Sequence, residues 1–115
     1  IGRVARLRDG AEAAYDRHHA AVWPKVQEAI SDAGIRNYSI FRHGRWLFSY
    51  FELPDGVTME GATARILREP ECLRWEALMQ ELQEPLSGSA GGLAWAPMPE
   101  VFHLAGGEIA AKEKR

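Results

Sequence analysis

Cysteine and long apolar runs are almost absent from the sequence. Cys72 is the one cysteine among 115 residues, so an intramolecular disulfide is excluded, as is usual for proteins of a reducing compartment. No stretch reaches the roughly eighteen apolar residues of a membrane span. The start, IGRVARLRDG, has no apolar stretch like that of a signal peptide. We therefore expect a cytoplasmic protein that does not insert into a membrane.

Strong charge and metal-binding patterns are also missing. The formal net charge is -2, and no Lys/Arg cluster supplies the attraction to phosphate that nucleic-acid binding requires. The histidines do not reproduce a known metal-ligand spacing, and no glycine-rich phosphate loop is present. We expect no nucleic-acid partner, no metal and no organic cofactor. We interpret Cys72 as a small buried apolar residue.

The composition is that of one ordinary globular domain. Hydrophobic residues make up 46% and charged residues 26% of the chain, and the length favours a single domain. We place this domain at residues 1–105 and a polar tail at 106–115. Four tryptophans are more than a core of this size usually needs, so some are expected to serve a ligand. Small domains also often gain stability from association with a second copy.

The first third of the sequence predicts a strand and then one long helix. Residues 2–8 alternate between apolar and polar side chains, which favours a strand with one wet face. The Asp9–Glu12 spacing is typical of a helix cap, and Gly34 can adopt the left-handed conformation that ends a helix. We expect the helix to reach Ala33, with a kink at Pro24 because proline removes a backbone donor.

The rest of the sequence predicts a hairpin, two short helices and a last strand. We expect strands at residues 36–42 and 46–53 around a glycine turn, helices at 59–67 and 70–82, a Gly/Ser-rich loop at 85–92 and a strand at 98–104. This order predicts an α+β, ferredoxin-like βαββαβ fold, in which an antiparallel sheet carries helices on one face. The other face needs cover, and the sheet of a second copy would supply it in a dimeric α+β barrel.

The densest group of polar and aromatic side chains lies in the first helix. His19 is one turn from both Tyr15 and Trp23, whereas His18 is rotated by about 100° around the helix axis. His19 is either an ordinary surface or core histidine or a general acid/base, because imidazole titrates near neutral pH.

Two aromatic residues elsewhere are further candidates. Tyr38 and Trp75 are either structural aromatics or parts of a pocket, where a flat ring covers an apolar patch and a phenol or indole meets a hydroxyl. Arg17, Arg42 and Arg74 could also hydrogen-bond hydroxyl groups, although a solvated charge is the simpler interpretation of each.

Four motifs, taken in order, resemble the L-rhamnose mutarotase family. They are Y-x-x-x-H-x-x-x-W-P at residues 15–24, G-x-x-N-Y-x-I at 34–40, Arg74-Trp75, and E-V-F-H-L at 100–104. The resemblance implies a homodimeric α+β barrel that interconverts the anomers of L-rhamnose or a related deoxy-pyranose without a cofactor.

The resemblance also assigns residues to that reaction. It implies that His19 is the proton donor and that Tyr15, Tyr38 and Trp75 contact the sugar. Opening of a pyranose ring requires one proton at the ring oxygen and removal of another from the anomeric hydroxyl. Tyr15 would position a hydroxyl or share the second proton transfer, so His19 and Tyr15 are the catalytic candidates.

Two positions depart from the pattern of that family. His18 stands where the family often has arginine, and Glu76 stands where it often has a second tryptophan. A carboxylate in the sugar site would alter the polarity and hydrogen bonding of the site, and so its preference among sugars. The alternative is that Glu76 faces solvent.

Two other functions are compatible with the same fold class. Small dimeric α+β barrels also include cofactor-independent and haem-dependent oxygenases, and an aromatic pocket can bind a small metabolite without catalysis. Haem absorbance or oxygen consumption would indicate an oxygenase. Sugar binding without anomer exchange would indicate a binding module.

Overall fold

A computed structural model describes residues 1–86 and 95–106 of the chain. Its sheet is antiparallel, with the strand order β2-β3-β1-β4. The three long strands are β1 (Gly2–Leu7), β2 (Arg36–His43) and β3 (Trp46–Glu52). The hairpin predicted between β2 and β3 is confirmed, and Gly44 in its turn has a φ of 59°, a conformation that glycine adopts without steric cost.

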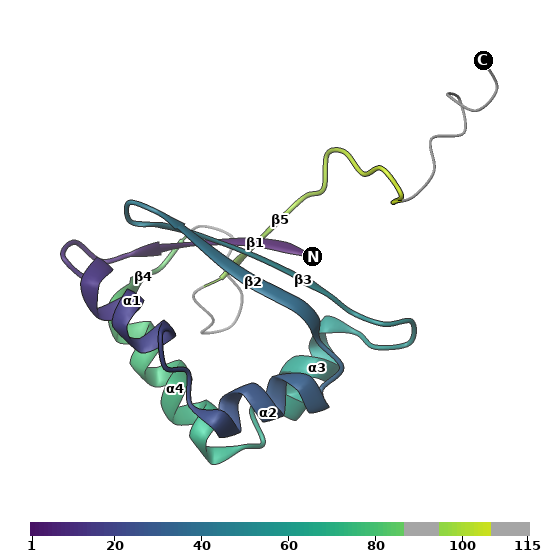
Figure 1. Ribbon diagram of the computed structural model, residues 1–115, viewed down its shortest axis with the longest axis horizontal. Coiled ribbons are helices and arrows are strands. Elements are labelled where there is room, and N and C mark those ends of the chain that lie inside the picture. Colours follow the sequence, from purple (N-terminus) through teal and green to yellow (C-terminus); the bar gives the residue numbers. More distant parts are fainter. Residues whose placement is uncertain (87–94, 107–115) are drawn as a thin grey trace.

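Two short strands share the free edge of β1. β4 (Gln83–Glu84) pairs with Arg6 and Leu7, and β5 (Ala96–Met98) pairs with the stretch from Gly2 to Val4. The last strand predicted at residues 98–104 is therefore wrong. Met98 lies opposite Gly2, the first residue of β1, so β5 ends where its partner strand begins. Residues 99–106 instead extend away from the sheet (Figure 1).

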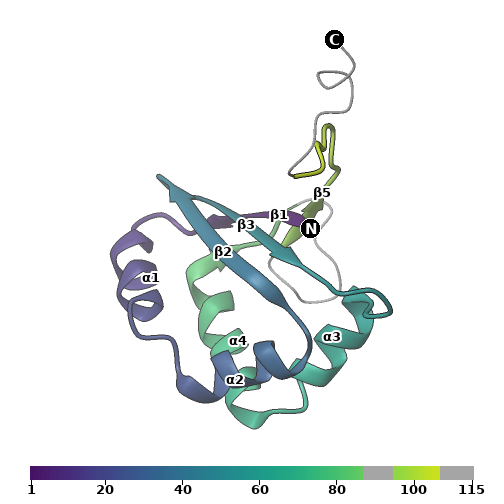
Figure 2. The same ribbon diagram turned by 45° about the vertical axis from the view of Figure 1, so that its right-hand side comes forward.

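Four helices cover one face of the sheet, as Figures 1 and 2 show. They are α1 (Glu12–His19), α2 (Pro24–Asp32), α3 (Met59–Ile66) and α4 (Pro70–Leu82). The predicted α+β, ferredoxin-like arrangement is thereby confirmed. Within the described ranges, no helix combines the length and apolar character that a bilayer crossing demands. The tail predicted at 106–115 lies outside the described residues from position 107 onward.

The single kinked helix predicted for the first third of the chain is wrong, because two separate helices form. Trp23 leaves the helical region with φ −58° and ψ 134°, since a residue that precedes proline is driven toward extended geometry. Pro24 then opens α2 at a position where its missing donor costs nothing. Gly34 has a φ of 93° after α2, which confirms the predicted helix end.

The predicted side-chain cap of the first helix is also wrong. Ala11, and not Asp9, is the N-cap residue of α1, and no side chain caps the helix. The tight turn between β1 and α1 uses Gly10 at a φ of 82°, so the helix begins two residues later than the capping pattern indicates. In contrast, the Thr58 hydroxyl accepts a hydrogen bond from the Gly61 amide at the start of α3.

Strict alternation along β3 gives the sheet an inner and an outer face. Leu47, Ser49 and Phe51 are buried beneath the helices, whereas Trp46, Phe48 and Tyr50 are exposed. Such alternation is expected because successive side chains of a strand point to opposite faces. The outer face carries a cluster of exposed apolar side chains formed by Phe41, Trp46, Phe48, Tyr50 and Met98.

Candidate active site

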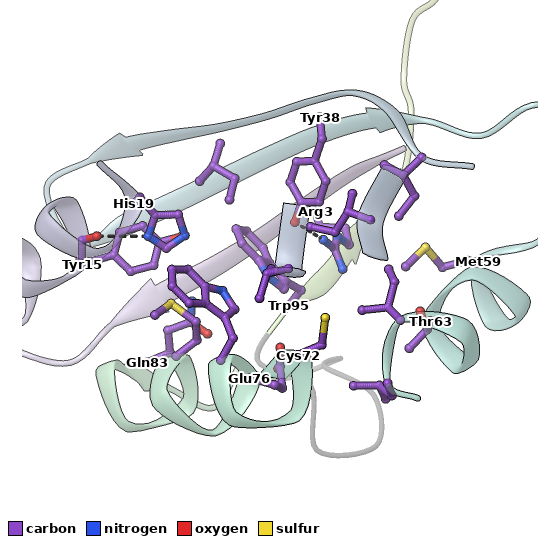
Figure 3. Close-up of a pocket in the computed structure, with 18 residues that line it drawn as sticks. Arg3, Tyr15, His19, Tyr38, Met59, Thr63, Cys72, Glu76, Gln83 and Trp95 are labelled. Carbon is purple, nitrogen blue, oxygen red and sulfur yellow. Dashed lines mark hydrogen bonds between the residues drawn. The ribbon is translucent and has the colours of Figure 1, made fainter. Parts of the chain in front are cut away.

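A cavity of about 120 Å³ lies between the inner face of the sheet and the helices (Figure 3). The predicted residues Tyr15, His19, Tyr38 and Trp75 all line it. This volume is several times the roughly 10–15 Å³ that one ordered water requires. A hollow lined by His19, Tyr38 and Trp75 together with residues 20–22 adjoins it, so the cavity borders the connection between α1 and α2.

Tyr15 and His19 form a stacked pair in the last two turns of α1. Their ring centroids are 4.0 Å apart and their planes differ by 23°, as the spacing of four residues allows. The Nδ1 atom of His19 lies 3.0 Å from the backbone carbonyl oxygen of Tyr15. Because a carbonyl oxygen can only accept, Nδ1 carries the proton and donates it, and Nε2 is left with a lone pair in the neutral ring.

Burial controls the charge states of this pair. It lowers the pKa of His19 below its ordinary value of 6.5, partly offset by the hydrogen bond to the Tyr15 carbonyl. The neighbouring His18 lowers the pKa of His19 further. Burial also raises the pKa of the Tyr15 phenol. At neutral pH the pair therefore consists of a neutral imidazole and a protonated phenol.

Trp75 reaches the pair from α4. Its ring is buried and lies edge-on to His19, with centroids 5.4 Å apart. Trp23, the N-cap residue of α2, also packs edge-on against Trp75, with ring centroids 5.1 Å apart, so the indole of Trp75 contacts residues of both α1 and the start of α2. His18 contacts the same indole edge-on at 6.4 Å, outside the wall of the cavity, which agrees with its predicted rotation away from His19.

Tyr38 enters the cavity from the inner face of β2 and is held by Arg3. The Nη2 atom of Arg3 donates to the Tyr38 hydroxyl at 2.8 Å, and Nε donates to the Ser49 hydroxyl at 3.4 Å. Since Tyr38 accepts from Arg3, its own hydroxyl proton is free to point to a ligand. Burial raises the pKa of Tyr38, partly offset by the positive charge of Arg3, so the phenol stays protonated.

Two charged residues of the cavity were not among the predicted site residues. Arg3 also lies over the rings of Phe51 and Trp95, at 4.9 and 5.0 Å, and this stacking holds its charge under the helices. Glu76 lines the cavity, so the alternative that it faces solvent is wrong. Nothing in the sequence around Arg3 marks it as a site residue, whereas the departure of Glu76 from the family pattern pointed to the sugar site.

The arginines considered from the sequence lie elsewhere. Arg17 and Arg74 are exposed and do not line the cavity. Arg42 is exposed as well and forms a two-pronged ion pair with Asp16, at 2.7 and 2.6 Å. This pair ties β2 to α1 beside His19.

The remaining wall of the cavity is mostly apolar. Cys72 lines it as a buried thiol, and burial raises the pKa of that thiol, which agrees with its interpretation as an apolar residue. No group of three His, Cys, Asp or Glu side chains suitable for a metal occurs in the part of the chain that the structure describes. An aromatic and apolar cavity with a few placed polar groups suits a small neutral polar ligand.

Comparison with known proteins identifies relatives along the whole domain. The family described as L-rhamnose mutarotase matches residues 1–104. An L-rhamnose mutarotase from Opitutus terrae is 37% identical over 103 residues, which are 88% of this chain and 93% of that protein. An L-fucose mutarotase from Xanthomonas campestris is 35% identical over 105 residues, which are 88% of this chain and 84% of that protein.

A solved structure shows the same fold. The crystal structure of an L-rhamnose mutarotase from Formosa agariphila superposes with a TM-score of 0.69 at 20% identity, covering 90% of this chain and 96% of that one. The sequence matches establish the family relationship, and the solved structure supports the fold. The chain belongs to the L-rhamnose mutarotase family.

Proposed function

We propose that this protein is a mutarotase that interconverts the α and β anomers of L-rhamnose or a related 6-deoxy-pyranose. One observation carries the proposal: a neutral His19 with Nε2 free to take a proton lines the same cavity as Tyr15, Tyr38 and Trp75. Family membership supplies the reaction, and the relatives include proteins named for rhamnose and for fucose. The activity makes the protein a carbohydrate isomerase.

In this proposal His19 is the general base of ring opening. Nε2 removes the proton of the anomeric hydroxyl, the bond between C1 and the ring oxygen breaks, and the ring oxygen gains a proton. The aldehyde then turns about the C1–C2 bond and the ring closes on its other face. In closure the hydroxyl formed from the ring oxygen attacks C1 and gives its proton back to the group that supplied it, while the imidazolium of His19 returns a proton to the anomeric oxygen. The expected role of His19 as proton donor therefore belongs to this half of the reaction.

The phenols and the indole complete the site. Tyr15 and Tyr38 keep their protons because burial raises the pKa of each, so either can donate a hydrogen bond to a sugar oxygen. Tyr15, stacked on His19, is the phenol that we assign to the proton of the ring oxygen. Trp75 offers an aromatic edge and face to the apolar side of the pyranose.

We further propose that the protein acts as a cytoplasmic homodimer. The exposed cluster on the outer face of the sheet, with Phe41 at 62%, Tyr50 at 46% and Trp46 at 39% exposure, gathers apolar side chains as interaction surfaces do. A second copy would cover it with its own sheet, since twofold contacts bring identical patches together. The unpaired Cys72 agrees with a reducing compartment.

Anomer exchange measured by NMR saturation transfer tests the activity. Saturation of the α-anomer signal of L-rhamnose should reduce the β-anomer signal when protein is present, well beyond the spontaneous rate. L-Fucose is the second sugar to be tested. Absence of enhanced exchange for both sugars would reject the proposal, and calorimetric binding without exchange would identify a binding module instead.

A further inference from the structure

Two opposite charges face the cavity from its two layers. Arg3 enters from β1 in the sheet, and Glu76 enters from α4 on the helical side, as Figure 3 shows. Arg3 uses two of its N–H groups to donate hydrogen bonds to the hydroxyls of Tyr38 and Ser49. A guanidinium has five N–H donors, so among the described residues three remain for a ligand or water.

Glu76 can accept hydrogen bonds where Arg3 can donate them. Its carboxylate is half-buried, and burial raises the pKa of the carboxyl group, while a hydrogen bond from Gln80 and the charge of Arg3 lower it. A carboxylate offers about four acceptor sites. The Gln80 contact leaves most of them for hydroxyl donors, and partly buried oxygen atoms without such donors are costly.

The combination favours one class of ligand. A cation would be repelled by Arg3 and an anion by Glu76, because both charges act in a poorly solvated space. A sugar hydroxyl both donates and accepts, so neighbouring hydroxyls of one neutral pyranose can serve the two groups at once. His19 and Tyr15 lie at one end of the lining and Met59 and Thr63 at the other (Figure 3), with Glu76 between them.

We propose that Glu76 is a specificity-determining residue, whose carboxylate accepts hydrogen bonds from pyranose hydroxyls away from the anomeric carbon while Arg3 donates to them. This inference rests on the proposed function for the identity of the reaction. Glu76 takes no part in proton transfer, which belongs to His19 and Tyr15. Its contribution is therefore to substrate affinity and to the choice among sugars that differ in hydroxyl configuration.

The test compares the wild type with Glu76→Gln and with the control Glu81→Gln. Glu81 is exposed on the same helix and does not line the cavity, so its variant makes the same charge change elsewhere. L-Rhamnose and L-fucose are the probes, because they differ in hydroxyl configuration at C2 and C4. Two-dimensional exchange NMR gives kcat and KM for each sugar, and calorimetry gives Kd.

Loss of hydrogen bonds to a charged acceptor should raise KM and Kd about ten- to a hundredfold for the preferred sugar. We expect kcat within about threefold of wild type, since the proton-transfer groups are intact. The preference between the two sugars should shrink, and Glu81→Gln should behave as wild type. Unchanged KM and Kd in Glu76→Gln, or a loss in kcat alone, would overturn the assignment.

The two proposals fail in different ways. If the wild type binds a sugar but does not exchange its anomers, the proposed function is rejected, and Kd still decides the role of Glu76. If neither sugar binds to the wild type, both proposals are rejected. If thermal melting shows that Glu76→Gln does not fold, Glu76→Asp replaces it in the test. Asp keeps the negative charge but its shorter side chain withdraws the carboxylate from the ligand, so KM and Kd should rise by the same factor. Unchanged values in that variant would overturn the assignment.

Discussion

The inner and outer faces of the sheet both carry tyrosines, but the two faces differ in what surrounds them. On the inner face, Tyr38 packs at 5.3 Å from Phe51 and accepts a hydrogen bond from Arg3. On the outer face, Tyr50 is 46% exposed and donates to the Glu52 carboxylate at 2.6 Å. The same residue type lines the cavity on the covered face and is a surface residue on the open one. Whether a tyrosine lies in the candidate site therefore depends on the helices that cover the inner face, and not on the residue type.

The largest expected effect concerns the inner face. His19→Ala should lower the rate of anomer exchange by about 10²- to 10⁴-fold, because it removes the proposed general base. His43, exposed at the end of β2, supplies the matched control, and His43→Ala should leave the rate unchanged. Exchange NMR measures both variants. An undiminished rate in His19→Ala would remove this residue from the mechanism and weaken the contrast between the faces.

A second variant tests the outer face. Phe48→Asp places a charge in the exposed apolar cluster, and a charge buried without a partner is strongly unfavourable. We expect at least a hundredfold weaker association of the homodimer by analytical ultracentrifugation, a loss of about 2.7 kcal/mol. Gln27→Asp on the exposed side of α2 is the control. A monomeric wild type would reject the homodimer.

A pair of tyrosine variants compares the faces directly. Tyr38→Phe should lower kcat/KM for the sugar about tenfold, because one hydrogen bond to the ligand is lost and Arg3 loses its acceptor. Tyr50→Phe, whose hydroxyl contacts Glu52 on the outer face, should stay within about twofold in the same exchange measurement. Equal losses in the two variants would mean that the faces are not functionally distinct.

The smallest expected effect is a dependence on pH. Because burial lowers the pKa of His19 below 6.5, the neutral base is present at pH 7, and the exchange rate should fall only as the pH drops through this lowered value. The unfolded chain protonates first, near pH 6.5. The contribution of His19 to stability is therefore full above that pH and is lost as the pH falls through the folded pKa. Rate and thermal-melting profiles of wild type and His19→Ala check this, and an identical decline in melting temperature for both would contradict it.

Local spacing was enough to predict part of the site. Tyr15 and His19 are four residues apart on one helix, so their stacking follows from helix geometry. The placing of Tyr38 and Trp75 beside them depends on contacts between a strand and two helices, which no local pattern encodes. Their aromatic character made these two residues candidates, and the resemblance to the family assigned them to the sugar site.

The remaining differences between the elements predicted from the sequence and those of the structure have physical causes. The strand predicted at residues 2–8 was expected to have one wet face, and no face was assigned to its arginines. Alternation along the strand directs Arg3 inward, where aromatic rings and hydroxyl groups hold it, and Arg6 outward over Trp46 at 5.0 Å. The helix at residues 12–32 breaks because the residue before Pro24 prefers an extended conformation. The final strand does not continue through residues 99–104 because Met98 already lies opposite Gly2, the first residue of β1.

The break between α1 and α2 has a consequence for the histidine itself. Because α1 stops at His19, the imidazole lies at the negative end of the helix dipole, where the last carbonyl groups have no amide partners within the helix. In the proposed mechanism the ring becomes an imidazolium when the sugar ring opens, and this end of the helix favours the new positive charge. The burial that keeps the resting imidazole neutral is thus opposed by a local field that eases its transient protonation.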